Sequence, residues 1–407
     1  MSNYSKQLDY IDLFLLSTGH ILGAGIFVLV GKISKYSGYN SWISILIAGL
    51  MALWFGKSFI NIAKKYPQND TEYKVIEERF GSTISKMVTT GILIGNVMTC
   101  LVVALSFGGY LSEISPLSSQ FSSLLCVLIS SFIAIIGIKE TSIFTNITTI
   151  METSGLYLII ILGIYQLVFQ QSGISSIVKN IKNIKNIKNI KNIKNLVNLV
   201  NLKDVNITSI ISGILLGAYI IIFAFFGFET VVRFIEESKN PDEDVPSAIS
   251  NSIYFTTFTY ILVSIISLSF IKPTIISNSK APLFDVIKKM PLGSYLAPFL
   301  GITAVASTLN TFLLTLAGNS RLFANFVKMD ENNTSNNKEL YSPIISKLSG
   351  LMSNIDSKYK TPVNSTIFLT IIILFLMIIK IDIIPATIIG NTGIISGLLG
   401  VKMADIL

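Results

Sequence analysis

A carboxylic acid lies deep inside one of the apolar stretches of the sequence. Glu152 is part of "NITTIMETSGLYLIIILG" (146–163), where an ionised side chain in a membrane helix would cost about 2.5–3.5 kcal/mol. Burial favours the neutral, protonated acid, so Glu152 is a candidate to exchange a proton as its access to water changes. The structural alternative is a hydrogen bond from Glu152 to a neighbouring helix.

A second group of charged residues follows directly after an apolar run. Glu229, Arg233 and Glu237 are spaced i, i+4 and i+8 in "GFETVVRFIEESKNP" (227–241), so they share one face of a helix. In one interpretation Glu229 is a protonatable group beside a bound substrate, and Arg233 sets its charge. In the other, the three residues form a ladder of ion pairs that eases a charged helix end through the membrane interface. The sequence leaves both open.

The residue types that mark soluble enzymes are scarce. The chain has one histidine, His20, and two cysteines, Cys100 and Cys126, both in apolar runs. No Cys/His cluster, nucleophile elbow or phosphate-binding loop is found, so we expect no enzyme activity, no metal and no cofactor. The formal net charge of +8 comes largely from loops and is no reason to expect a nucleic-acid partner.

The composition predicts an all-α integral membrane protein whose surroundings are the lipid bilayer. Of 407 residues, 51% are hydrophobic and 13% are charged, against about 25% charged in soluble domains, and the mean hydropathy is +0.66. A membrane-spanning helix needs about 20 mostly apolar residues. Ten stretches meet this requirement, at 11–31, 41–63, 84–111, 121–138, 143–169, 208–235, 247–271, 295–318, 363–380 and 383–401.

One long segment separates two groups of five predicted helices. Within it, "VKNIKNIKNIKNIKNIKNLVNLVNLKD" (178–204) repeats every three residues, a period that matches neither a helix nor a strand face. We predict that 170–206 is a low-complexity loop on the outer surface, between a first unit (1–169) and a second (207–407); a basic patch for anionic lipid or a partner protein is the alternative. With this loop set aside, the distribution of Lys and Arg predicts a multi-pass chain with a cytoplasmic N-terminus, in either the plasma membrane or an endomembrane.

Glycines gather in the first predicted helix and again in the sixth. The first contains "GHILGAGIFVLVG" (19–31) and the sixth contains "AFFGFE" (224–229). An interrupted first helix in each of two five-helix units is typical of an inverted-repeat transporter with its site near the midplane. Freed N–H groups favour a carboxylate and freed carbonyl groups favour an ammonium group, so the pattern predicts a zwitterionic ligand. The alternative is that these glycines serve only close helix packing.

Four motifs resemble those of the amino acid–polyamine–organocation permease superfamily. They are 19–31, "GFETVVRFIEESKNPDEDVPSAI" (227–249), "NTFLLTLAGNSRLFANFVKMD" (310–330) and "KYKTPVNS" (358–365), in the family's order and spacing. The resemblance covers nearly all of the chain outside 170–206. It implies secondary transport of amino acids or related amines by alternating access, with twelve helices usual and the first ten forming the core. The last two would be absent here.

The resemblance also implies a substrate site built mainly from backbone groups. Amide N–H groups would hold the substrate carboxylate, carbonyl oxygens would accept from its amino group, and glycines would permit the helix breaks. The N–H groups belong to Ala24, Gly25 and Ile26, the carbonyl groups to Ile21, Phe223, Ala224 and Phe226, and the glycines at the breaks are Gly23 and Gly227.

The resemblance leaves the coupling ion open. The position of Glu152 resembles one that is a lysine in several relatives and an acid in others. A carboxylate there can carry a proton or, with Ser307, Thr308 and Thr311, bind sodium. We therefore predict a proton-coupled symporter, an antiporter or an exchanger of amino acids, with Glu152 and Glu229 as ion-coupling residues. A nutrient receptor that does not transport, or a degraded permease, is the alternative.

Overall fold

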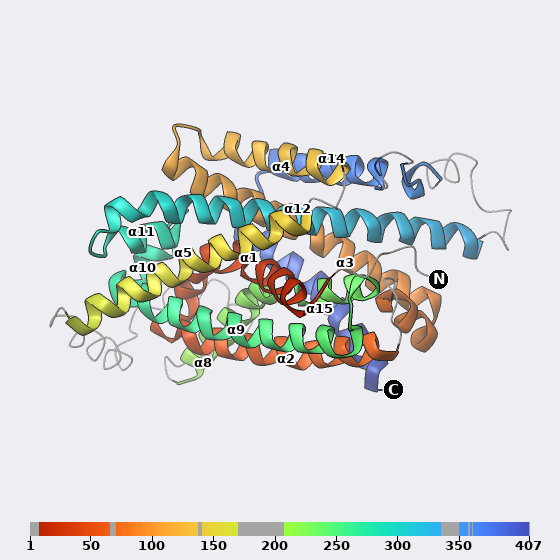
Figure 1. The fold of residues 1–407 in the computed structure, drawn as a ribbon, viewed down its shortest axis with the longest axis horizontal. Helices are drawn as coiled ribbons and strands as arrows, with labels where there is room; N and C mark the ends of the chain where they lie inside the picture. Colours follow the sequence, from red (N-terminus) through yellow and green to blue (C-terminus); the bar gives the residue numbers. More distant parts are fainter. Residues whose placement is uncertain are drawn as a thin grey trace.

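The computed structural model describes residues 8–65, 71–136, 141–169, 207–334, 350–356, 359 and 361–406. These residues are mostly helical, and the one extended pairing among them is a parallel bridge between Leu8 and Ser238. Figure 1 shows most of the long helices lying side by side along the long axis of the molecule. The predicted loop at 170–206 lies outside the described residues.

Two groups of long helices make up the described chain. The first group is α1 (Tyr10–Ser37), α2 (Ser41–Lys65), α3 (Thr71–Ile114), α4 (Ser119–Ile136) and α5 (Thr141–Phe169), with the short η1 (Gly38–Asn40) after α1. The second is α8 (Ile207–Ile221) continued by η3 (Ile222–Phe225) and η4 (Phe228–Glu237), then α9 (Pro241–Phe270), α12 (Gly293–Thr334), α14 (Val363–Ile379) and α15 (Ile383–Ile406). Two short helices, α10 (Pro273–Ile276) and α11 (Pro282–Lys288), precede α12.

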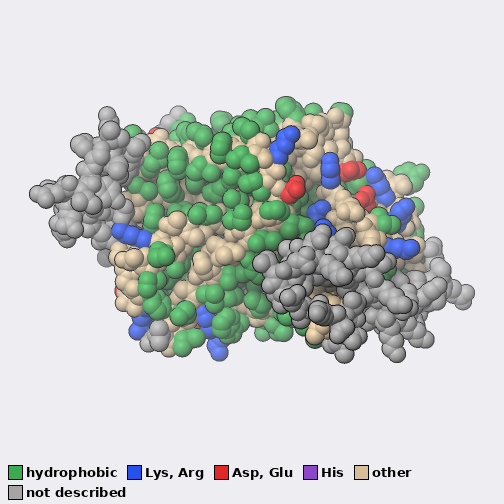
Figure 2. Space-filling view, turned by 180° about the vertical axis from the view of Figure 1, so that it is seen from behind, with side chains coloured by type: hydrophobic (Ala, Val, Ile, Leu, Met, Phe, Trp, Pro, Cys, Tyr) green, Lys and Arg blue, Asp and Glu red, His purple; other side chains and the backbone are tan. Residues whose placement is uncertain are grey.

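The ten predicted spans correspond to these helices. Eight stretches of the described chain are long and apolar enough to cross a membrane; the first of them contains both α1 and α2, and α14 is a shorter apolar helix. Figure 2 shows hydrophobic side chains over much of the surface, with Lys and Arg mostly toward the two ends of the molecule. This distribution fits a bilayer around the middle of the helices.

Two helices extend well beyond the apolar runs that predicted them. α3 was expected over 84–111 but begins at Thr71, and it bends at Gly81, where φ is 82° and ψ is 166°. α12 was expected to end near 318 and continues to Thr334. Both extensions are polar, so hydropathy alone does not detect them, although a helix that leaves the membrane can continue into water.

The helices of the two groups pack in reciprocal pairs. α1 contacts α9, the second helix of the other group, and α2 contacts α8. In the same way α3 contacts α15, and α12 contacts α5. In each case a helix of the first group contacts a helix of the second group, and the two helices at the equivalent positions with the groups reversed are also in contact. A five-plus-five repeat produces this arrangement.

The short helices α10 and α11 cover the end of α1. The Lys32 ammonium group donates to the Ser277 carbonyl oxygen at 3.2 Å. The Tyr110 hydroxyl of α3 donates to the Phe27 carbonyl oxygen and accepts from the Leu283 N–H at 3.3 Å. These bonds tie α3 and the second half of α1 to the connection that contains α10 and α11.

Candidate functional site

The first helix is interrupted where its glycines gather. Gly23 has a non-helical backbone, with φ 11° and ψ −146°. A Cβ atom at Gly23 would overlap the Thr311 hydroxyl, and one at Gly25 would overlap the Ala224 Cβ and lie 2.5 Å from the Ala224 Cα. The break therefore places α1 in direct contact with α12 and with the sixth helix, and the predicted interruption of the first helix is confirmed.

The sixth helix is broken over a longer stretch. α8 ends at Ile221, the 3₁₀ turn η3 follows, and Phe226 is extended, with φ −67° and ψ 144°. Gly227 then has φ 125°, a region that glycine reaches without the steric cost of a Cβ atom. A Cβ there would also lie 2.8 Å from the Cγ of His20. The predicted break of the sixth helix is confirmed, and Gly227 is the residue that permits it.

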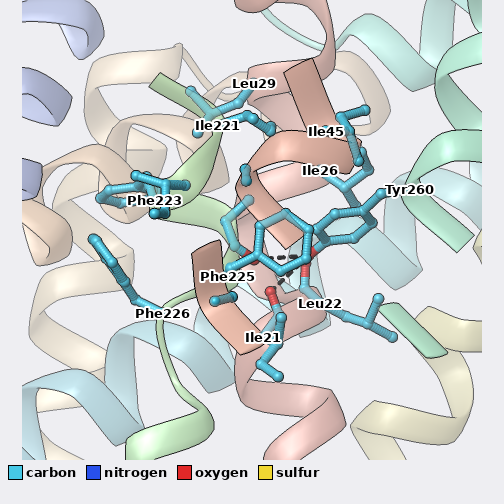
Figure 3. Packing of buried hydrophobic residues seen from close by; sticks show 14 of the residues in the cluster. Ile21, Leu22, Ile26, Leu29, Ile45, Ile221, Phe223, Phe225, Phe226 and Tyr260 are labelled. Carbon is cyan, nitrogen blue, oxygen red and sulfur yellow. Dashed lines mark hydrogen bonds between the residues drawn. The ribbon is translucent and has the colours of Figure 1, made fainter. Parts of the chain in front are cut away.

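A buried tyrosine from α9 joins the two breaks. The Tyr260 hydroxyl lies 2.7 Å from the carbonyl oxygen of Ile21, 3.2 Å from that of Leu22 and 3.1 Å from that of Ala224, as the dashed lines in Figure 3 indicate. Its single proton is shared among these acceptors. Tyr260 thus satisfies carbonyl groups that unwinding removes from regular helix bonding, and it holds the two broken segments together.

A cavity lies beside the two breaks. Its walls come from α1, α3, the sixth helix, α12 and α15. Six of the residues predicted to bind substrate line it, namely Ile21, Gly25, Phe223, Ala224, Phe226 and Gly227. In Figure 3 the Phe223 and Phe226 side chains lie on the side of the α1 break opposite Tyr260. The cavity thus combines apolar side chains with the backbone of both broken helices.

Polar side chains that were not among the predicted substrate-binding residues complete the wall, and one of them, Thr311, was predicted as a sodium ligand instead. They are His20, Asn96, Thr99, Thr311 and Thr315. The Asn96 amide donates to the Asn319 side-chain oxygen at 3.2 Å, and the His20 Nε2 lies 3.5 Å from the Thr315 Oγ1. Their spacing is a signal that could have identified them, because polar residues three or four positions apart share one face of an otherwise apolar helix.

Three predicted substrate-binding residues are not among the lining residues. Gly23 faces Thr311, and Ile26 is fully buried in the hydrophobic core. The side chain of Ala24 lies outside the described part of the structure. The role predicted for this segment depends on its N–H groups rather than its side chains, and it stays a prediction.

Three of the four carbonyl groups predicted to accept from a substrate amino group already have a donor. Ile21 and Ala224 accept from Tyr260, and Phe223 accepts from the Phe226 N–H at 3.3 Å. A carbonyl oxygen has two lone pairs, so each can accept a second hydrogen bond. An ammonium group here would therefore share acceptors with Tyr260.

Glu229 lies at the start of η4 and lines the cavity. One of its carboxylate oxygens accepts from the Gly227 N–H at 2.8 Å. A carboxylate at this position is stabilised by the unpaired N–H groups at the beginning of a helical segment. The side chains of Arg233 and Glu237 lie outside the described part of the structure, so the ion-pair ladder stays a prediction.

Glu152 is fully buried on α5, toward α1 and α12. A Cβ atom on Gly19 would lie 3.2 Å from a Glu152 carboxylate oxygen, and the Ser307 hydroxyl of α12 lies beside the carboxylate. Within the described residues neither Glu152 oxygen forms a hydrogen bond of regular geometry, and the Ser307 hydroxyl is close enough for only a weak one. An isolated charge would be costly there. No group of three His, Cys, Asp or Glu side chains that could hold a metal ion occurs in the described ranges.

The sequence profile of a family described as amino acid permease matches residues 8–388. This chain belongs to that permease family. The permease is a multi-pass integral membrane protein, since the same residues form the apolar helices described above.

Curated relatives of the permease are distant in sequence. It is 22% identical over 334 residues to cationic amino acid transporter 7, chloroplastic, of Arabidopsis thaliana, a match covering 78% of this chain and 53% of that protein. It is 24% identical over 318 residues to the branched-chain amino acid permease BcaP of Bacillus subtilis (strain 168), covering 78% and 66%. The match therefore spans between about half and two thirds of these relatives' length.

The fold of the permease resembles that of a solved membrane symporter. It resembles a Na⁺-coupled sialic acid symporter, solved in a substrate-bound outward-open state, with a TM-score of 0.59. The match covers 92% of this chain and 76% of that chain at 15% identity. At this identity the likeness concerns the fold alone, and it agrees with the reciprocal packing of the two helix groups.

Proposed function

We propose that this permease is a secondary active transporter that moves amino acids or related amines across a membrane by alternating access. The observation that carries the proposal is the cavity beside two helix breaks in contact with each other, where backbone polar groups lie outside regular helix bonding. Membership of the amino acid permease family supports it, as do relatives named as amino acid transporters. The distribution of Lys and Arg supports a cytoplasmic N-terminus.

The binding mode in this proposal uses both ends of a zwitterion. The N–H groups of Ala24, Gly25 and Ile26 bind the substrate carboxylate. Its ammonium group binds carbonyl oxygens of the first and sixth helices. The side chain of the substrate then meets the polar wall of the cavity. Residues 1–169 and 207–407 act as the two repeats, which move relative to each other around the site while 170–206 remains an outer loop.

Coupling is assigned to Glu152 and Glu229, with a proton as the first candidate ion. A neutral acid fits the buried position of Glu152, which has no partner to compensate a charge among the described residues. Sodium is the second candidate, because the Ser307 hydroxyl oxygen lies beside the Glu152 carboxylate and the fold resembles that of a Na⁺-coupled symporter.

The direct test of the proposal is uptake by the full-length chain in proteoliposomes. Radiolabelled cationic, branched-chain and aromatic amino acids are supplied with a proton gradient, with a sodium gradient and with neither. We expect accumulation of at least one amino acid above the level in protein-free vesicles, driven by one of the two gradients. If no amino acid accumulates or exchanges, the nutrient receptor or the degraded permease replaces this proposal.

Glu152→Gln separates coupling from binding. The amide keeps the size of the side chain but cannot release a proton. An imposed gradient of about one pH unit supports roughly tenfold accumulation per coupled proton, and we expect the variant to lose this accumulation while counterflow exchange persists. Glu113→Gln is the control, because Glu113 is partly exposed and forms only a 3.8 Å ion pair with Lys288. Proton-driven accumulation by Glu152→Gln equal to that of Glu113→Gln would dismiss Glu152 as the carrier.

A further inference from the structure

A row of polar side chains on α5 leads away from Glu152. Thr145, Thr149 and Glu152 are at i, i+4 and i+7, so they share one helix face. All three are buried. The Thr149 hydroxyl donates to the Thr145 carbonyl oxygen at 2.7 Å and lies 3.2 Å from the Leu15 carbonyl oxygen of α1. This row runs against α1 from the middle of α5 toward its beginning.

A matching row faces it from α12. Asn310 is fully buried, and its side-chain oxygen accepts from the Thr145 hydroxyl at 3.1 Å. Ser307, one turn away, lies beside Glu152. We call these five residues, Thr145, Thr149, Glu152, Ser307 and Asn310, the α5–α12 seam. Thr311, next to Asn310 on α12, lines the cavity, so the seam adjoins the substrate site.

The seam contains polar atoms that the described residues leave unsatisfied. They are both Glu152 oxygens, the Ser307 hydroxyl and the Asn310 side-chain nitrogen. Each buried group without a partner is costly, so native proteins usually pair such atoms with other groups, water or ions. Four such atoms, of which Ser307 and Glu152 can form only a weak bond with each other, lie along this one helix interface, where water would satisfy them.

The far end of the seam reaches partly exposed residues. Asn146, next to Thr145 on α5, donates to the Asp12 carboxylate at 3.2 Å. Asp12 belongs to the first turn of α1 and also accepts from the Asp9 N–H. On the α1 side, a Cβ atom at Gly19 would overlap the Thr149 hydroxyl, so α1 presents backbone rather than a side chain there. The backbone of α1 at Gly19 therefore covers the middle of the seam.

We infer that Glu152 exchanges its proton through the α5–α12 seam with the water at the end of the molecule where α1 begins, and that the hydrogen bond between Thr145 and Asn310 is the gate. When the gate opens, Glu152 releases a proton to water and becomes a carboxylate; uptake is the reverse step. The inference rests on the proposed function for its role in coupling. It adds the route, and it assigns Asn310 and Thr145 as positioning residues.

The charged and titratable groups around Glu152 are few. From α9, Tyr260 lies within electrostatic reach of it. In the first half of α1 the titratable side chains are Tyr10, Asp12 at the mouth of the seam and His20 in the cavity. The described α12 residues of the seam are uncharged. No second carboxylic acid among the five seam residues would therefore obscure a change in the protonation of Glu152.

The test measures protonation rather than transport. Dicyclohexylcarbodiimide is an apolar reagent that modifies carboxylic acids in their protonated form, and mass spectrometry of the Glu152 peptide reports the extent of labelling. Full-length protein in proteoliposomes is moved from about pH 6 to about pH 9, and the reagent is added after increasing delays. In the wild type we expect labelling to fall, because the protonated fraction drops about tenfold per pH unit above the midpoint.

Asn310→Leu and Thr145→Val replace the gate with apolar side chains of similar size. Both variants also remove the polar atoms that water needs as hydrogen-bond partners at this point of the seam. We therefore expect both to retain their labelling at least about tenfold longer after the pH change. Thr145→Ser keeps the hydroxyl and should behave as the wild type. Thr153→Val is the matched control, because one residue along a helix is a rotation of about 100° and places Thr153 off the seam.

Two results overturn the inference. One is labelling in Asn310→Leu and Thr145→Val that follows pH as quickly as in the wild type. The other is wild-type labelling that does not depend on pH. The proposed function is judged separately. If the labelling result is as expected but no amino acid accumulates, the proposed transport function is rejected and the proton route through the seam is kept. If the wild type transports amino acids but the labelling of Glu152 follows pH equally fast in all variants, the proton route through the seam is rejected and the proposed transport function is kept.

Discussion

Gly25→Ala should lower the initial rate of amino acid uptake by roughly tenfold to a hundredfold. The added methyl group would overlap the Ala224 Cβ and lie 2.5 Å from its Cα, and these atoms belong to the sixth helix rather than to a flexible side-chain end. Overpacking of this kind costs about 1–3 kcal/mol. If the binding-competent arrangement bears this cost, kcat/KM falls by the corresponding factor. Uptake in proteoliposomes measures it.

Gly350→Ala is the matched control for this variant. A Cβ atom at Gly350 meets nothing within 4 Å, so the same chemical change there should leave the uptake rate unchanged. Thermal unfolding in detergent shows whether Gly25→Ala still folds. A folded Gly25→Ala protein that transports at the rate of Gly350→Ala would show that the contact between the two breaks is not needed for binding.

Tyr260→Phe should raise KM about tenfold and lower the thermal stability. Phenylalanine keeps the ring but removes the hydroxyl that Ile21, Leu22 and Ala224 share. A buried carbonyl group that loses its donor costs about 1–3 kcal/mol. The two breaks would also lose the group that fixes their relative position, so substrate would bind to a less ordered site. Uptake kinetics and the unfolding temperature measure the two effects.

Tyr254→Phe provides the comparison on the same helix. Tyr254 is 60% exposed, whereas Tyr260 is fully buried. The two substitutions remove the same hydroxyl group, so they differ only in the surroundings of that group. We expect its KM and unfolding temperature to remain those of the wild type. If Tyr260→Phe behaves in the same way, the hydroxyl does not hold the breaks together and the carbonyl groups have other donors.

The helix breaks could be predicted because their cause is local. At Gly23 the absent Cβ atom leaves room for Thr311, and at Gly227 the φ of 125° is one that glycine reaches without steric cost. The number of helices could be predicted because hydropathy reports burial in lipid. The ends of α3 and α12 could not, since they lie beyond the apolar runs.

Tyr260 could not be predicted for the opposite reason. It lies in an apolar helix, and its role depends on carbonyl groups more than 30 residues away in the chain. Asn310 is similar, since its partner Thr145 comes from another helix. One residue at a time, neither differs from an ordinary polar group in a membrane helix. Only the packing of α5, α9 and α12 around α1 gives them a partner.

The bonds of Tyr110 to Phe27 and Leu283 have a consequence for inhibition. They hold the connection that contains α10 and α11 against the second half of α1, whereas the cavity involves the first half of α1, at His20 and Ile21. We therefore expect a bulky competitor to reach the cavity from the opposite face of the membrane. Its potency should therefore depend on the face of the vesicle to which it is applied. A compound that inhibits uptake from one face should have no effect from the other.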